Sequence, residues 1–308
     1  MVDAEIREQL LEIGCSFEEN QPFAKIGYWR IGGNLRWLVS VENTSQLQRL
    51  LALHLPVLIL GNGSNMLLSD QGFDGLALQL VGEFETLSFT ENGVLAGAGM
   101  PNVTVLSRLK REGRGGLGSL AGVPGTIGGA IRMNAGTYLG EIGEVVDWVE
   151  WIDTETPTEI HRTGVTDLQF AYRRVGLPWT AVVLRTHLYT HSNHVDEERE
   201  SIKKHLARRK ETQPLHLPSC GSVFKNPAGD YAGRLIEQVG LKGYQIGQAQ
   251  ISDKHANFIV NLGGATAQDV ASLIRLTRET VYQETGIRLE PEVRREGQWD
   301  DGVWTLSH

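Results

Sequence analysis

Two glycine-rich segments are places where the main chain, rather than a side chain, could bind a ligand. The longer one, Gly116 to Gly136, reads GLGSLAGVPGTIGGAIRMNAG, and the shorter one, Gly61 to Asn65, follows the apolar run VLIL. Glycine permits positive φ and close approach, so successive free N–H groups in such loops form nests that bind phosphate oxygens. Polar donors lie in or beside both segments: Ser64, Asn65, Ser119, Thr126 and Asn134. Two nests suit a diphosphate and therefore predict a dinucleotide site, with tight turns in a β-rich protein as the alternative.

Neither segment has the spacing of a common nucleotide-binding motif. Residues 61–66 do not match G-x-G-x-x-G, and G-x-x-x-x-G-K-[ST] occurs nowhere in the chain. The pattern therefore predicts a ligand held in a fold other than the Rossmann type.

The segment PSCGSVFKNP at 218–227 is a second candidate for chemistry. Its small residues expose main chain and two hydroxyls, and Lys225 and Asn226 add polar groups. The alternative is a loop in which serine and asparagine satisfy backbone groups. A hydrolase triad has little support because no G-x-S-x-G surrounds the serine. Cys220 could be a thiolate nucleophile, but a small buried apolar residue is the better interpretation.

Three further sets of charged residues have a functional and a solvated interpretation. Adjacent Arg173 and Arg174 usually face solvent, although an arginine can also stabilise a developing oxyanion. Pro291 forces an extended path that could aim Glu292 inward. In the charged segment 195–211, Lys204, His205, Arg208 and Arg209 share one helical face, as a solvated surface or as a diphosphate clamp. For the two arginines and for Glu292, taken singly, the solvated interpretation is favoured, and for the basic helical face both interpretations stay open.

The periodicity predicts a mixed α+β chain with irregular strand pairing. Helices are expected at 3–13, 44–53, 103–112, 195–211, 231–239 and 266–285, and strands at 57–60, 76–80, 93–97, 145–152, 181–189 and 257–262. Thr44 is the expected N-cap of the second helix. Thr266 with Asp269 forms a capping box for the last helix, and Gly286 ends it.

Bulk composition narrows the class of protein. The 308 residues suggest two or three domains, and the net charge of −8 argues against a nucleic-acid binder. The longest apolar run, 50–60, is too short to cross a bilayer. The acidic N-terminus is unlike a signal peptide, so we expect a cytoplasmic protein. The two cysteines form no disulfide framework, and the histidines have no metal-ligand spacing, so we expect no metal.

Seven segments in this order resemble one family. They are YWRIGG (28–33), GNGSNMLLSDQGFDG (61–75), AGVPGTIGGAIRMNAG (121–136), AYRR (171–174), PSCGSVFKNPAGDYAGRLIEQVGLKG (218–243), SDKHANFIVN (252–261) and LEPEVRREG (289–297). The chain resembles the UDP-N-acetylenolpyruvoylglucosamine reductases, flavoenzymes of bacterial peptidoglycan precursor synthesis. The short stretch between Arg173 and Ser222 is similar to the form of the family without an inserted substrate loop, so the basic helix at 195–211 is expected to bind phosphate.

The resemblance implies a fold and a reaction. The fold is the FAD-binding fold of the vanillyl-alcohol oxidase type, with flavin-binding subdomains at 1–55 and 56–194 and a C-terminal α+β substrate domain at 195–300. Non-covalent FAD and the co-substrate NADPH would reduce the enolpyruvyl group of UDP-N-acetylglucosamine enolpyruvate to UDP-N-acetylmuramate. The expected partner is the small-molecule UDP-sugar, with no nucleic acid or membrane, and a monomer is favoured.

The resemblance also implies residue roles. Arg173, Ser222 and Glu292 match the catalytic positions. The expected FAD-binding residues are Gly61, Asn62, Gly63, Ser64, Asn65, Ala121, Gly122, Val123, Pro124, Gly125, Thr126, Gly128, Gly129, Asn134 and Ala135. The expected substrate-binding residues are Arg208, Arg209, Lys225 and Asn226.

Two other functions fit parts of the pattern. An oxidase of the same superfamily often tethers FAD to histidine or cysteine, and the segment 61–65 offers neither. A flavin-binding sensor or degenerate paralogue would not need all three catalytic residue types, which are present here.

Overall fold

The structure is a computed structural model that describes residues 3–299. The chain folds into two compact units, both discontinuous in sequence. The first contains the chain up to Glu19, Trp37–Gly61 and Gly75–Ala207, and the second contains Asn20–Arg36, Asn62–Asp74 and the chain from Arg208 onward. The predicted division of the chain into domains at 55/56 and 194/195 stays a prediction. Residues 1, 2 and 300, at the ends of the predicted domains, lie outside the described residues.

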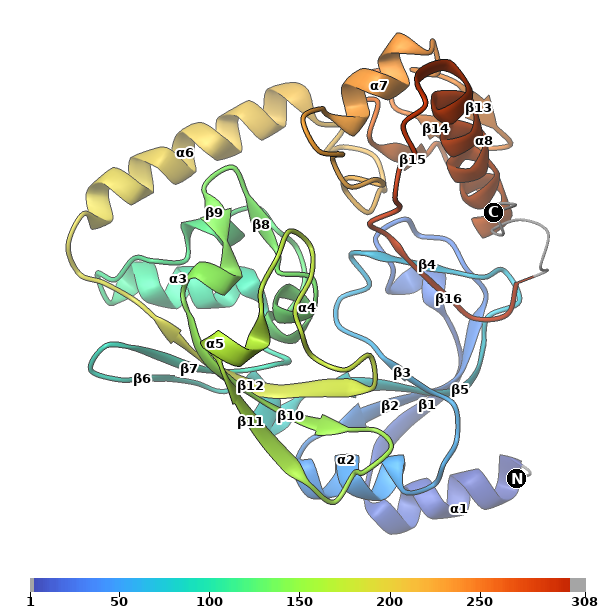
Figure 1. Ribbon diagram of the computed structural model, residues 1–308. Coiled ribbons are helices and arrows are strands. Elements are labelled where there is room, and N and C mark those ends of the chain that lie inside the picture. The colour runs from blue at the N-terminus through green and yellow to red at the C-terminus, as the bar shows by residue number, and fades with distance from the viewer. Residues whose placement is uncertain (1–2, 300–308) are drawn as a thin grey trace. The chain divides into compact units, whose positions relative to one another are not determined.

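Two larger sheets contain most strands of the first unit (Figure 1). Strands β1, β2 and β5 of one sheet also include residues assigned to the second unit. The five-stranded antiparallel sheet has the order β11 (Ile160–Gly164), β10 (Val146–Asp153), β12 (Ala181–Tyr189), β7 (Gly93–Gly97), β6 (Leu87–Phe89). The four-stranded sheet has the order β1 (Ser16–Pro22), β2 (Asn34–Val41), β5 (Phe73–Leu80), β3 (Val57–Ile59), with β3 and β5 parallel. This mixed pairing confirms the α+β prediction.

The first unit also contains helices that precede, connect and follow these strands in the chain. They are α1 (Asp3–Ile13), α2 (Thr44–Leu51), α3 (Asn102–Arg111), α4 (Ile127–Arg132), α5 (Val165–Leu168) and most of α6 (Val195–Thr212). Short 3₁₀ turns are η1 (Phe23–Lys25, in the second unit), η2 (Gly82–Glu85), η3 (Gly118–Leu120) and η4 (Ile142–Glu144), and a small hairpin joins β8 (Gly136–Thr137) to β9 (Gly140–Glu141). No helix within residues 3–299 is both long and apolar enough to cross a membrane.

The second unit packs two helices with short strands. Its elements are α7 (Ala232–Gln238), α8 (Ala267–Thr285), the antiparallel strands β13 (Gln245–Ile246), β14 (Ala249–Ile251) and β15 (Ile259–Asn261), and the parallel pair β4 (Met66–Leu68) and β16 (Arg294–Glu296). The predicted capping box is confirmed, because the Thr266 side chain accepts from the N–H of Asp269 and the Asp269 side chain accepts from that of Thr266. Gly286 ends α8 with φ +72.

One predicted cap is wrong. The N-cap of α2 is Asn43, whose Oδ1 accepts from the N–H of Gln46 at 3.0 Å. Thr44 is the first helical residue, and its hydroxyl donates to Glu83 at 2.6 Å. Asn43 is in extended backbone (φ −153), where its short amide reaches the free N–H of the first turn.

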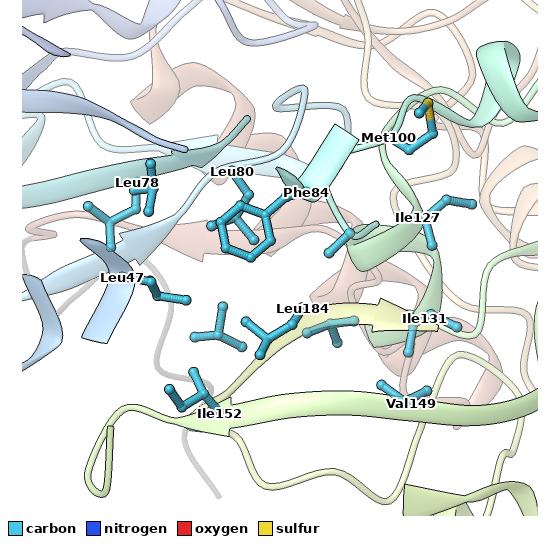
Figure 2. Packing of buried hydrophobic residues seen from close by; sticks show 14 of the residues in the cluster. Leu47, Leu78, Leu80, Phe84, Met100, Ile127, Ile131, Val149, Ile152 and Leu184 are labelled. Carbon is cyan, nitrogen blue, oxygen red and sulfur yellow. The ribbon is translucent and has the colours of Figure 1, made fainter. Parts of the chain in front are cut away.

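The glycine-rich helix α4 is anchored by its apolar residues in the hydrophobic core (Figure 2). Ile127 and Ile131 are fully buried in the same cluster as Met100 and Val149. Gly128 also faces inward: its N–H donates to the carbonyl of Ala98 at 2.8 Å, and a Cβ there would lie 2.9 Å from the Ala98 Cβ. Glycine at 128 therefore permits close packing on Ala98.

The neighbouring glycines of α4 make a matched test of this packing. Gly128→Ala is expected to lower the free energy of unfolding by about 1–3 kcal/mol, because the added methyl overpacks against Ala98. Gly129→Ala is expected to leave it unchanged or raise it, since a Cβ there meets only Thr126 Oγ1 at 3.8 Å. Urea unfolding of the two variants measures the difference, and equal midpoints would contradict the packing argument.

Candidate active site

The first unit brings the start of the short glycine segment to the start of α4. A Cβ on Gly61 would lie 3.0 Å from Thr126 Oγ1, so glycine at 61 permits this approach. Thr126 is the N-cap of α4 and accepts from the N–H of Gly129 at 3.5 Å. Gly125 has φ +118, a conformation closed to other residues. Gly61 and the expected cofactor residues 121–135 all belong to the first unit, and residues 62–65 belong to the second.

A buried hydroxyl in this region fits a bound polar cofactor. Ser119 is 6% exposed, and its Oγ has no hydrogen-bond partner among residues 3–299. A buried polar atom left unpaired costs free energy, so an unpaired hydroxyl beside a glycine nest suits a polar group supplied from outside the chain. From the sequence, Ser119 was only one of the polar donors in the longer glycine segment and was not among the expected FAD-binding residues.

The first turn of the longer glycine segment binds a carboxylate of the protein itself. Glu198 of α6 accepts from the N–H groups of Gly116 and Gly118 at 2.8 and 2.7 Å. A Cβ on Gly118 would lie 2.8 Å from this carboxylate, so glycine makes room for it. Glu198 therefore occupies the N–H groups of Gly116 and Gly118, and residues 121–135 stay the predicted FAD-binding part of the segment.

Arg173 is held by the main chain of the first unit, so the solvent-facing interpretation is wrong for this residue. Its side chain is 15% exposed and donates to the carbonyls of Asn134 at 3.4 Å and Gly136 at 3.2 Å, and to Glu141 Oε1 at 3.4 Å. Arg174 is exposed, as adjacent surface arginines usually are.

The second unit brings the segments of Ser222 and Glu292 side by side. The N–H of Glu292 donates to the carbonyl of Val223 at 2.8 Å, and Phe224 pairs with Pro291 in an isolated antiparallel bridge. The extended backbone expected at Pro291 therefore pairs with the segment that bears Ser222. Arg173 belongs to the first unit.

Asn257, which the sequence did not single out, holds this contact in place. Asn257 is 4% exposed; its Oδ1 accepts from the N–H of Phe224 at 2.9 Å and its Nδ2 donates to the Phe224 carbonyl at 2.8 Å. Asn65, expected to bind cofactor, donates through Nδ2 to the carbonyl of Glu292 at 3.0 Å. Asn257 lies in the SDKHANFIVN match, which was the only available signal for it.

Burial decides the role of Cys220. The thiol is 7% exposed, near the carbonyls of Gly63 and Met66. Burial raises the pKa of Cys220 to about 12, so the thiolate is scarce at neutral pH. The interpretation as a small buried apolar residue is confirmed.

The expected substrate-binding residues have different environments. Lys225 Nζ donates to Glu290, and Asn226 Oδ1 accepts from the N–H of Ala232 at 3.1 Å. These contacts fix both side chains near the Ser222 segment.

The four residues of the basic face of α6 do not form one solvated stripe. Lys204 and Arg208 are exposed, but His205 is 4% exposed and its ring packs edge-on against Tyr138. Arg209 is half-buried; burial lowers its pKa, and its Nε donates to Gln213 at 2.8 Å.

The fold and the glycine segments define a flavoprotein: the family described as "FAD binding domain" matches residues 36–163. The family "UDP-N-acetylenolpyruvoylglucosamine reductase, C-terminal domain" matches residues 213–295. A UDP-N-acetylenolpyruvoylglucosamine reductase 2 of Symbiobacterium thermophilum is 44% identical over 89% of each chain, and a UDP-N-acetylenolpyruvoylglucosamine reductase of Synechococcus sp. is 43% identical over 91% of each. The chain therefore belongs to the UDP-N-acetylenolpyruvoylglucosamine reductase family.

A solved structure agrees with this assignment. The crystal structure of the reductase from Thermus caldophilus superposes with a TM-score of 0.78 at 35% identity, covering 91% of this chain and 98% of that one. The expected FAD-binding fold and family resemblance are confirmed.

Asn257 can be tested directly. Asn257→Ala leaves the buried N–H and carbonyl of Phe224 without their side-chain partner, so the free energy of unfolding is expected to fall by about 2–5 kcal/mol. Asn193→Ala, at an exposed side chain, is the control and is expected to change little. Urea unfolding measures both; an Asn257→Ala midpoint equal to that of the control would contradict the assigned role.

Proposed function

We propose that this protein is a cytoplasmic, monomeric, NADPH-dependent flavoenzyme that reduces the enolpyruvyl group of UDP-N-acetylglucosamine enolpyruvate to give UDP-N-acetylmuramate. Membership of the reductase family, with an FAD-binding domain at 36–163, supports the reaction and the cofactor. The observation that carries the residue roles is the bridge between Phe224 and Pro291, because it joins the two segments that bear Ser222 and Glu292.

The cofactor fits the residues of the glycine segments. The main chain at 121–126, Thr126 and the buried Ser119 hydroxyl would hold FAD. When bound, FAD supplies hydride, taken from NADPH, to the terminal carbon of the substrate double bond. The expected FAD residues 61–65 and 121–135 keep this assignment as part of the proposal.

The protein's own groups complete the reduction at the neighbouring carbon. Hydride addition leaves negative charge on the α-carbon, delocalised into the adjacent carboxylate of the substrate. Arg173, and Glu292 in its protonated form, stabilise this charge by charge-assisted hydrogen bonds. The Ser222 Oγ gives its proton to the α-carbon and is left as an alkoxide that takes a proton back from solvent. Hydride and proton together saturate the double bond.

The main chain holds Ser222 for this transfer. Val223 and Phe224 are buried directly after it, and the N–H of Val223 donates to the carbonyl of Asn257 at 2.9 Å. Two rotatable bonds, Cα–Cβ and Cβ–Oγ, then separate the proton from a fixed backbone. Lys225 forms an ion pair with Glu290, and it keeps its assignment as a substrate-binding residue.

Ser222→Ala separates the two halves of the reaction. Reduction of FAD by NADPH is expected to stay near the wild-type rate, and reoxidation by the UDP-sugar to slow about a hundredfold or more, the usual size of a general-acid contribution. Binding of the UDP-sugar should persist because the hydroxyl acts mainly in the transition state. Stopped-flow flavin absorbance measures both steps.

The control is Ser222→Cys, which is expected to retain some of the second step because a thiol can donate a proton. Slow flavin reduction together with unchanged reoxidation in Ser222→Ala would refute the proton-donor role.

Arg208 is proposed to bind the phosphates of the substrate, with Arg209 supporting the helix from its half-buried position. Arg208→Ala is expected to weaken UDP-sugar binding severalfold at low salt, and less at high salt because exposed charges are screened. Lys203→Ala, which removes an exposed cation paired with Glu200, is the control. Isothermal titration at two ionic strengths measures the effect. Equal affinities of the two variants would refute phosphate binding by Arg208 and favour the solvated interpretation.

A further inference from the structure

Arg173 lies in a turn whose backbone conformation needs support. The N–H groups of Ala171 and Arg174 each donate to the carbonyl of the other, at 3.0 and 2.9 Å, closing a tight turn over 171–174. Inside it Arg173 has φ +55, in the left-handed region that residues with a Cβ rarely adopt. Such a conformation persists only where the surroundings hold it.

Asn134 supplies much of that support. It is 2% exposed and itself left-handed, with φ +41. Its Nδ2 donates to the carbonyl of Ala171 at 2.9 Å and to Glu141 Oε2 at 2.6 Å, and its Oδ1 accepts from the N–H of Gly143 at 3.0 Å. One buried amide therefore joins the turn, Glu141 and the start of η4.

The carboxylate of Glu141 contacts both Asn134 and Arg173. Its Oε1 is 3.4 Å from Arg173 Nη1, while its Oε2 accepts from Asn134. Glu141 is also the N-cap of η4, in a capping box with Glu144, so its position is set by the main chain of its own turn.

The guanidinium of Arg173 contacts two carbonyls and one carboxylate of the first unit. Its distances to Asn134 O, Gly136 O and Glu141 are 3.2–3.4 Å, longer than the roughly 2.7–2.9 Å of a strong charge-assisted hydrogen bond. These contacts orient the side chain that the proposed function places against the substrate carboxylate.

We propose that Glu141 is a positioning residue for the reaction: it orients the Arg173 guanidinium toward the substrate carboxylate and, through Asn134, holds the 171–174 turn. This inference rests on the proposed function, in which Arg173 stabilises the charge formed on the substrate.

The test compares the two halves of one capping box in the FAD-loaded enzyme. Glu141→Ala is expected to slow reoxidation of reduced flavin by the UDP-sugar about tenfold or more, and to weaken UDP-sugar binding to a similar degree, because the arginine loses its orientation. Flavin reduction by NADPH should stay within about twofold. Glu144→Ala breaks the same capping box without a recorded contact to Arg173 and is expected to leave both half-reactions near wild type.

A double variant identifies the path of the effect. In an Arg173→Ala background, adding Glu141→Ala is expected to cause no further slowing, because the group it positions is already gone. Multiplied effects, equal slowing of both half-reactions, or equal losses in Glu141→Ala and Glu144→Ala would overturn the positioning role. If Glu141→Ala does not fold, Glu141→Asp, which shortens the reach to Arg173, carries the same expectations.

Assays of the wild-type enzyme distinguish failure of the positioning role from failure of the proposed function. Failure of the wild-type protein to reduce the enolpyruvyl group would refute the proposed function. Normal wild-type turnover with an unaffected Glu141→Ala would refute only the positioning role.

Discussion

The structure depends on hydrogen bonds between buried side chains and the main chain of irregular segments. Main-chain groups that belong to no helix or strand must still find partners when they are buried. Asn257 supplies both partners of Phe224, and Asn134 joins the carbonyl of Ala171 to the N–H of Gly143. Each asparagine offers a donor and an acceptor on one short, stiff side chain, so it can hold two strands of chain at a fixed distance.

Carboxylates accept hydrogen bonds where two main-chain N–H groups lie close together. Glu198 binds two main-chain N–H groups at the start of the long glycine segment, and Asp70 accepts from those of Ala267 and Gln268 at 2.8 and 3.0 Å where α8 begins. These N–H clusters would also suit phosphate oxygens. A cluster of free N–H groups therefore predicts an anion, while the fold decides whether that anion comes from a ligand or from the chain.

These side-chain hydrogen bonds to the main chain explain how the candidate site can be built on loops. The loops are anchored at buried residues. Ile127 and Ile131 fix α4 in the core, so the loop before it is held although it has little regular structure. The Ser222 segment is held in the same way by buried Val223 and Phe224 and by Asn257. Reactive side chains can then project from backbones that do not move, which is the preorganisation that charge stabilisation requires.

Local sequence predicted the longer helices, the cap and stop of α8, and the glycine loops, because periodicity, capping and positive φ act over a few residues. Of the described strands it predicted β3, β5, β7, β10, β12 and β15, and it missed the others together with the short helices α4 and α5. The cap of α2 was misplaced by one residue because asparagine and threonine stand side by side there and both can cap. The segments bearing Arg173, Ser222 and Glu292 were candidates from their residue types, but their catalytic roles came from the family resemblance, which does not depend on knowing their contacts.

Only the tertiary structure decided which distant groups meet. It placed Glu198 on Gly116 and Gly118 and Asn257 on Phe224. It also buried His205 on the basic face of α6, for which the sequence allows a solvated surface or a diphosphate clamp. It also separated Arg173, held by carbonyls and Glu141, from the exposed Arg174 beside it. A side chain's type states which bonds it can make, but its partners here lie tens of residues away, and chain packing alone brings them within hydrogen-bond distance.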